Sequence, residues 1–236
     1  RECWFADGIK PEPTGSGVAP GSVVGRRALR VESAGHRFVE PREGFGGGLM
    51  ETLLLILVGV VLMGILVTIR KRLAAFPAQS PDDYDEGHPT FDLKRHLNGE
   101  MICEGVIYGP MGRVTSTFAA DFSISWDGDK GVMDELFRYN DGSTQTRQWR
   151  ITAKQDGKFD LEADDVPGGG SGVARGHAVQ MVYPIQIPEA SGGHVLACVD
   201  WMYLTPDGTI MNRSQFRKFG IKAAELIATI RPKDPA

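Results

Sequence analysis

Four polar side chains, Glu135, Arg147, Asp200 and Asn212, fall on the apolar side of segments in which apolar and polar residues alternate. In an apolar setting, a carboxylate and a guanidinium either neutralise each other or orient a polar group on an otherwise apolar ligand. The first option makes these residues structural, and the second makes them a binding site. The walls of such a site would come from large side chains of the same alternation, namely Phe122, Met133, Phe137, Trp149 and Met202.

Catalysis has less support. Glu135 and Asp200 could form an acid/base pair, but the sequence does not fix their separation. The chain has no Gly-X-Ser-X-Gly nucleophile motif, and the run 168–172 (Gly-Gly-Gly-Ser-Gly) lacks the lysine and helix that follow a phosphate-binding loop. We therefore expect a protein that is not an enzyme.

The histidines and cysteines do not indicate a metal site or a cofactor. The five histidines show no pair at the spacing that places two imidazoles around one ion. The three cysteines, Cys3, Cys103 and Cys198, lack CxxC spacing and leave a Cys103–Cys198 disulfide open. With 26 basic and 30 acidic side chains and a net charge of -4, the chain also lacks the basic footprint of a nucleic-acid-binding protein.

Three turn signals position the polar residues. Asn140-Asp141-Gly142, Gln155-Asp156-Gly157 and Pro206-Asp207-Gly208 each fit a three-residue hairpin loop with glycine in the left-handed conformation. In the second hairpin such a loop sets Ile151 opposite Leu161, so that apolar residues share one face. The same rule sets Glu135 opposite Arg147 in the first hairpin and points Asp200 inward, near Asn212, in the third.

The third hairpin also has an outer face. The register leaves Trp201, Tyr203 and Arg213 outside. They could form a contact surface for a partner protein or for lipid headgroups, or they could stack as exposed cross-strand pairs.

From Glu100 onward the apolar residues recur with period two, which is typical of half-buried strands. We expect eight to ten strands in meander order, and such a meander usually closes because closure removes exposed edges. The predicted fold is mainly β: an antiparallel meander that closes into a calycin-like or lipocalin-like barrel. About eight strands leave an interior that side chains fill or that holds one small ligand.

A hydrophobic helix precedes this domain. Residues 52–69 carry no charge, and a helix of that length nearly matches a hydrocarbon core of about 30 Å. We expect a transmembrane signal anchor over residues 50–73, with residues 53–69 in the bilayer. The cations Arg70, Lys71 and Arg72 argue against a cleaved signal peptide and, by the positive-inside rule, favour a cytoplasmic barrel over a periplasmic one.

The remaining segments are assigned from composition. Residues 1–49 lack apolar periodicity, and Met50 directly precedes the apolar run. Residues 1–49 are thus either upstream sequence that is not translated or a disordered tail. Residues 74–89 carry three prolines and an acidic run, which predicts a solvated linker, and residues 90–233 remain for the barrel.

Six short motifs occur in this order along the chain: Phe91-Asp92-Leu93, Asn98-Gly99, Trp126-Asp127-Gly128, Asp200-Trp201-Met202-Tyr203, Asn212-Arg213 and Lys218-Phe219-Gly220. The set resembles the uncharacterised bacterial family catalogued as domain of unknown function 3833. The resemblance spans about residues 91–231 and implies no established activity, substrate or catalytic residue. Some members look like lipoproteins with a lipid-bearing cysteine, whereas this chain has no cysteine between Cys3 and Cys103, which is compatible with the helix as the anchor.

The resulting hypothesis is a single-pass protein of the bacterial inner membrane whose barrel binds a small amphipathic or lipid-like ligand. Its binding residues would be Glu135, Arg147, Asp200, Asn212, Trp149, Phe122 and Met202. The alternative is an accessory subunit of a larger membrane complex, with a solid barrel and the face of Trp201, Tyr203 and Arg213 as its contact.

Overall fold

The computed structural model describes residues 45–86, 88–189 and 192–233, so most of the predicted tail 1–49 lies outside the described residues. The chain divides into two units, whose described parts are residues 45–75 and the barrel that begins at Phe76. The first unit holds helix α1 (Phe45–Leu73). Its Gly48–Arg70 portion is 23 residues with a hydropathy of 2.9, long and apolar enough to cross a membrane.

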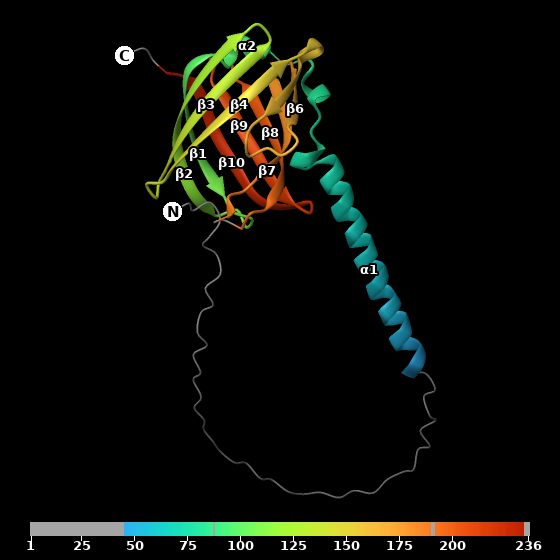
Figure 1. The fold of residues 1–236 in the computed structure, drawn as a ribbon. Helices are drawn as coiled ribbons and strands as arrows, with labels where there is room; N and C mark the ends of the chain where they lie inside the picture. Colours follow the sequence, from blue (N-terminus) through green and yellow to red (C-terminus); the bar gives the residue numbers. More distant parts are fainter. Residues whose placement is uncertain (1–44, 87, 190–191, 234–236) are drawn as a thin grey trace, which may run out of the picture. The chain divides into compact units, whose positions relative to one another are not determined.

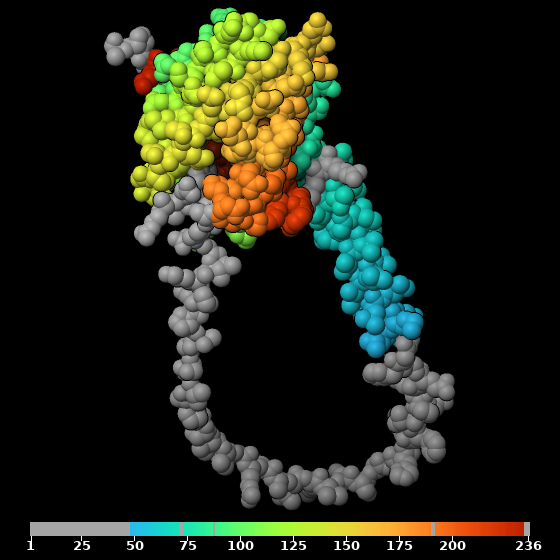
Figure 2. Space-filling model, in the orientation of Figure 1, coloured from blue at the N-terminus to red at the C-terminus, as the bar shows by residue number. Residues whose placement is uncertain are grey.

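The second unit is a closed antiparallel barrel of ten strands in which each strand pairs with its neighbours in sequence and β1 pairs with β10 (Figure 1). The predicted fold class is confirmed. In the space-filling view, the green and yellow atoms of β2 to β4 form one wall (Figure 2). The strands are β1 (Gly99–Tyr108), β2 (Val114–Asp127), β3 (Lys130–Tyr139), β4 (Thr144–Ala153), β5 (Lys158–Glu162), β6 (Gly170–Arg175), β7 (Ala178–Gln186), β8 (Val195–Leu204), β9 (Ile210–Lys218) and β10 (Ile221–Pro232).

The three hairpin registers follow the three-residue-loop rule. Ile151 pairs with Leu161 across β4 and β5, and Glu135 pairs with Arg147 across β3 and β4. On β8 and β9, Asp200 pairs with Ser214, so its side chain turns into the barrel. These registers confirm which face of each strand points inward.

Short helix α2 (Leu93–His96) covers one end of the barrel. Asp92 caps it by accepting hydrogen bonds from the backbone N–H groups of Lys94 and Arg95. Phe91 and Leu97 are each only 3% exposed, and Trp126 Nε1 donates to the Leu97 carbonyl oxygen at 2.7 Å. This end is therefore closed by side chains.

The opposite end of the barrel is more open. There, inward-facing residues near the strand ends are only half-buried, in contrast to the fully buried side chains next to α2. These half-buried residues are Phe137, Gln145, Ile185, Phe216 and Leu226. The interior is therefore less well covered by side chains at this end than at the end next to α2.

The predicted solvated linker is wrong for its central part. Two 3-10 helices, η1 (Phe76–Ala78) and η2 (Pro81–Tyr84), lie on the outside of the barrel. The Tyr84 ring packs edge-on against Trp201 at 5.3 Å and against Tyr203 at 5.6 Å between centroids. The acidic residues of this segment face solvent while its aromatic residues pack, and composition alone could not separate the two.

Candidate functional site

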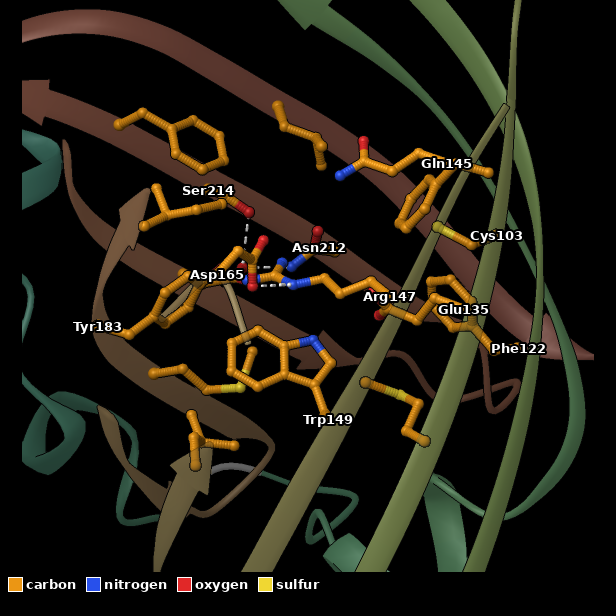
Figure 3. Close-up of a pocket in the computed structure, with 18 of the residues that line it drawn as sticks. Cys103, Phe122, Glu135, Gln145, Arg147, Trp149, Asp165, Tyr183, Asn212 and Ser214 are labelled. Carbon is orange, nitrogen blue, oxygen red and sulfur yellow. Dashed lines mark hydrogen bonds and ion pairs between the residues drawn. The ribbon is translucent and has the colours of Figure 1, made fainter. Parts of the chain in front are cut away.

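The barrel encloses a cavity of about 160 Å³ that is lined mainly by apolar side chains, with a few polar groups near its middle (Figure 3). Aromatic walls come from β2, β4 and β7 through Phe122, Trp149 and Tyr183. Met202 of β8 also lines it. An apolar cavity with a small number of polar groups is the usual form of a small-molecule site.

Arg147 is the cation of this cavity. Its guanidinium carbon lies 4.1 Å from the Trp149 ring centroid and 5.7 Å from that of Tyr183. Its Nε donates to Asp165 Oδ1 at 3.0 Å. Stacking on two rings and an ion pair fix the plane of the guanidinium and leave Nη2 as the atom with free donor capacity.

Glu135 lies opposite Arg147 in the β3–β4 register, as predicted, but Arg147 forms its ion pair with Asp165 instead. Glu135 Oε2 and Arg147 Nη2 are both buried, and neither has a hydrogen-bond partner among the described residues. The option of a satisfied internal Glu135–Arg147 pair is therefore wrong. A buried polar atom without a partner costs about 1–3 kcal/mol, so two in one cavity call for an explanation.

Asp200 differs from Glu135 because its carboxylate is well satisfied. Its Oδ1 accepts hydrogen bonds from Asn212 Nδ2 and, at 2.8 Å, from Ser214 Oγ. The Tyr183 hydroxyl lies 3.5 Å from Oδ2. This network joins β7, β8 and β9 inside the barrel and holds the Asp200 side chain in place.

Burial controls the protonation of the interior carboxyl groups. Desolvation raises the pKa of Glu135 to about 8, against the lowering effect of Arg147. Desolvation also raises the pKa of Asp200, although the hydrogen bonds from Ser214 and Asn212 act in the opposite direction. Glu135 is therefore mostly protonated at neutral pH and can donate a hydrogen bond as well as accept one.

The two cysteines of the barrel are free and buried, which settles the open question of a Cys103–Cys198 disulfide. Burial raises the pKa of both thiols, and the carboxyl groups of Glu135 and Asp200 add to the rise for Cys103. Thiols with a raised pKa are poor nucleophiles.

The glycine run at 168–172 has a packing role. A Cβ on Gly172 would lie 2.1 Å from Cζ of Phe159, and one on Gly170 would lie 2.6 Å from Cβ of Tyr183. Gly172 lets strand β6 pass directly over the Phe159 ring, and Gly170 lets it approach the backbone of β7 at Val182 and Tyr183. The run is the turn before β6 and the start of that strand, packed against bulky neighbours, rather than a phosphate-binding loop.

The family model for DUF3833, described as a protein of unknown function, matches residues 71–232. The chain belongs to this family. A comparison with curated proteins gives no match.

Among solved structures, the chain is similar to the S-type phycobiliprotein lyase CPES from Guillardia theta, with 9% identity and a TM-score of 0.45 over 60% of this chain and 91% of that one. It is also similar to a protein of unknown function from the DUF3598 family of Nostoc punctiforme, with 13% identity and a TM-score of 0.43 over 62% of this chain and 51% of that one. No functional conclusion follows from likeness at this level.

The structure brings all seven predicted binding residues to the barrel interior or its wall. Glu135, Arg147, Trp149, Phe122, Asp200, Met202 and Asn212 all line the same cavity. By contrast, the side chain of Trp201 is fully buried under Tyr84, and Tyr203 OH donates to Gln79 Oε1 at 2.6 Å. Arg213 is engaged by Glu225 at 2.6 Å.

Sequence reasoning missed Asp165 and Tyr183. Asp165 continues the inward series of Phe159, Leu161 and Ala163, so the alternation carried a usable signal beyond the end of the strand. The sequence signal for Tyr183 was weaker, because Tyr183 is one aromatic residue in a strand that is apolar on both faces.

Proposed function

We propose that this DUF3833 member is a non-enzymatic, membrane-anchored barrel that binds a small amphipathic ligand through a hydrogen-bond-accepting head group. The observation that carries the proposal is the pair of buried atoms without partners, Glu135 Oε2 and Arg147 Nη2, in one apolar cavity. A ligand oxygen between these two atoms would remove the cost of both.

The protonation state of Glu135 determines which kind of ligand head group fits the cavity. A protonated Glu135 offers an O–H donor, and Arg147 Nη2 offers an N–H donor, so the matching ligand atom is a carbonyl or carboxylate oxygen. A cationic amine head would face Arg147 without a compensating anion, because Asp165 already pairs with Arg147.

The cavity sets the size of the bound part. A volume of about 160 Å³ is close to that of an apolar cavity known to hold one benzene-sized molecule. We propose that the head group and the adjoining carbons lie among Trp149, Phe122 and Met202, while a longer tail extends toward the open end. The satisfied Asp200 and the unreactive buried thiols support binding rather than catalysis.

The membrane anchor in the proposed function is helix α1. Helix α1 has the length and apolar character of a membrane span. The three cations at its carboxyl end, residues 70–72, favour a cytoplasmic location for the barrel and make a bacterial inner membrane the expected site. The alternative of an accessory subunit has less support, because the chain's own residue Tyr84 already covers the outer face that it would use.

Ligand binding is tested with three fluorescent probes of equal chain length: a fatty acid, its methyl ester and the corresponding primary amine. We expect the acid and the ester to bind the detergent-purified full chain at least about tenfold more tightly than the amine. Arg147→Leu should weaken binding of the acid by about tenfold or more. Arg150→Leu, an exposed change on the outer face of the same strand, is the matched control. Equal affinity for acid and amine, or an equal effect of both substitutions, would contradict the proposal.

Topology is tested separately. Lys130 is exposed at the start of β3, next to the β2–β3 turn, and suits a cysteine label in the variant Lys130→Cys. A membrane-impermeant maleimide applied to intact cells should leave this cysteine unlabelled, and it should label the cysteine after lysis. Labelling of intact cells would place the barrel outside the cytoplasm.

A further inference from the structure

The open end of the barrel carries large apolar side chains that point into solvent. Phe219 is 92% exposed, Met111 is 88% exposed and Ile221 is 74% exposed. Transfer of these side chains from water into an apolar environment would be favourable, since complete burial of one large apolar side chain contributes about 1.5–3 kcal/mol. Apolar side chains that gather in this way mark a contact surface more often than scattered ones do.

These residues lie on neighbouring hairpins. Met111 is in the turn between β1 and β2, and Phe219 and Ile221 lie at the turn between β9 and β10. Strands β1 and β10 pair with each other, so the two turns are adjacent on the rim. In Figure 1 the β9–β10 turn, drawn in red, lies at the end of the barrel opposite α2. We call the two turns, residues 109–113 and 218–222, the apolar rim.

The conformation of Phe219 is a second and independent observation. The turn Phe219-Gly220 has positive φ at both residues, 51° and 76°. Such a turn favours Asn or Gly at its first position, and a bulky residue in the left-handed region costs about 1–2 kcal/mol. Phenylalanine here is unfavourable for the turn and, being exposed, gains nothing from the core. A role outside folding accounts for it.

Basic residues lie within the apolar rim and directly beside it. Arg113, Arg217, Lys218 and Lys222 lie on the same two hairpins, and Lys218 Nζ is 5.7 Å from the centroid of the Phe219 ring. Glu225, the nearby acid, is already bound by Lys222 and Arg213. The exposed acids at this end, Asp141, Asp164 and Glu189, lie on the turns and loops between β3 and β8.

We infer that the apolar rim docks on an anionic lipid surface, with Phe219 and Met111 inserted among the lipids and with Arg113, Arg217 and Lys218 at the headgroups. Apolar side chains next to lysine and arginine are the combination that binds anionic bilayers. The inference rests on the membrane anchoring in the proposed function. Only Ala74 and Ala75 separate α1 from Phe76, about 7 Å of extended chain, so an anchored barrel stays within reach of lipid. Docking of this rim would open the cavity toward the bilayer, from which an amphipathic ligand could enter.

The test uses the full chain in proteoliposomes of phosphatidylcholine and phosphatidylglycerol, with and without bromine on the acyl chains as a quencher of Trp fluorescence. Phe219→Trp reports on the rim, and Lys130→Trp is the matched control at the closed end. We expect the added Trp at position 219 to be quenched at least about threefold more than the one at position 130. In vesicles of phosphatidylcholine alone, this difference should shrink.

A second variant separates lipid contact from folding. In a Met111→Trp background, Phe219→Asn should reduce quenching of the Trp at 111 by about threefold, because the cooperative insertion of the two turns is lost. The melting temperature should stay the same or rise, since Asn tolerates positive φ. Equal quenching at 219 and 130, or unchanged quenching in the double variant, would overturn the inference.

Flotation of the same samples tests membrane anchoring by α1 separately from docking of the apolar rim. If the chain floats with the vesicles but the Trp at 219 is not quenched, anchoring stands and rim docking is wrong. If the chain does not float and shows no quenching, both are wrong. Quenching at 219 without stable flotation would support rim docking and contradict the anchor.

Discussion

Arg147 Nε lies 3.0 Å from Asp165 Oδ1, and this ion pair joins β4 to the segment that follows β5 inside the barrel. The backbone pairing of β4 with β5 ends at Arg150 and Glu162. Residues 144–149 of β4 therefore have no residue of β5 opposite them. The Asp165 carbonyl oxygen also accepts a hydrogen bond from the backbone N–H of Gln186 on β7, at 2.7 Å. Asp165 thus bridges the wall between β4 and β7, where β5 and β6 are too short to do so.

We expect Asp165→Asn to destabilise the chain by about 1–3 kcal/mol, because it leaves the mostly buried charge of Arg147 without its counterion. Urea unfolding monitored by Trp fluorescence measures the change. Asp129→Asn breaks the exposed pair with Lys94 and should cost no more than about 0.5 kcal/mol. Similar losses for both variants would mean that the Arg147–Asp165 pair has no special structural weight.

Glu135 should make the barrel less stable as pH rises. Burial raises its pKa from 4.5 to about 8, so between these values the folded chain keeps a proton that the unfolded chain has released. The unfolded state then binds fewer protons, and the free energy of unfolding falls with pH by up to about 1.4 kcal/mol per unit. Glu135→Gln should flatten this slope in unfolding experiments from pH 5 to 8.

Asp200 contributes a slope of the same sign because burial raises its pKa too. The Glu135→Gln variant therefore keeps a residual pH dependence, which Glu135→Gln combined with Asp200→Asn should remove. Parallel pH profiles for the native chain and Glu135→Gln would show that Glu135 is ionised in the fold.

The hairpins explain why much of the site was predictable. A three-residue loop with glycine in the left-handed position, such as Gly142 with φ 84°, fixes which residues face each other, and from there the alternation assigns each side chain to the interior or the surface. Glu135, Arg147 and Asp200 were placed inside by this local rule, and the paired strands confirm it.

The ion-pair partners were not predictable to the same degree. The register that sets Ile151 opposite Leu161 would, if continued past the end of β5, place Asp165 opposite Arg147, so the sequence did encode the true partner, three residues beyond the end of the strand. Which of Glu135 and Asp165 comes within 4 Å of the guanidinium depends on the twist of the strands and on the stacking over Trp149, and neither is visible in the sequence.

The burial of Trp201 could not be predicted from the sequence for a different reason. Its outward position was predicted, yet it is fully buried, because residues from about 120 positions earlier in the chain cover it. The aromatic Tyr84 sits among prolines and aspartates, and such a composition indicates a solvated segment. A contact of this range depends on the closed barrel and cannot be found from local patterns.

Tyr84→Ala should therefore uncover Trp201 and destabilise the chain by about 2 kcal/mol through the lost aromatic contacts. The expected signature is a red shift of Trp emission together with a lower melting temperature. Tyr84→Phe keeps the ring and loses the hydroxyl group that donates to Gln79, so it should cost about 1 kcal/mol and leave the emission unchanged. An unshifted spectrum for Tyr84→Ala would mean that Tyr84 does not shield Trp201 in solution.

Gly172→Ala tests the packing role of the glycine run. The added Cβ would lie 2.1 Å from the Phe159 ring, which is almost fully buried and has little room to move. We expect a loss of about 1–3 kcal/mol in unfolding free energy, the usual cost of overpacking a core. Ser171→Ala is the matched control, because Ser171 is the exposed neighbour on the same strand and its change should be nearly neutral. If Gly172→Ala were as stable as Ser171→Ala, the ring of Phe159 would have another place to go, and the strand would not need glycine at this position.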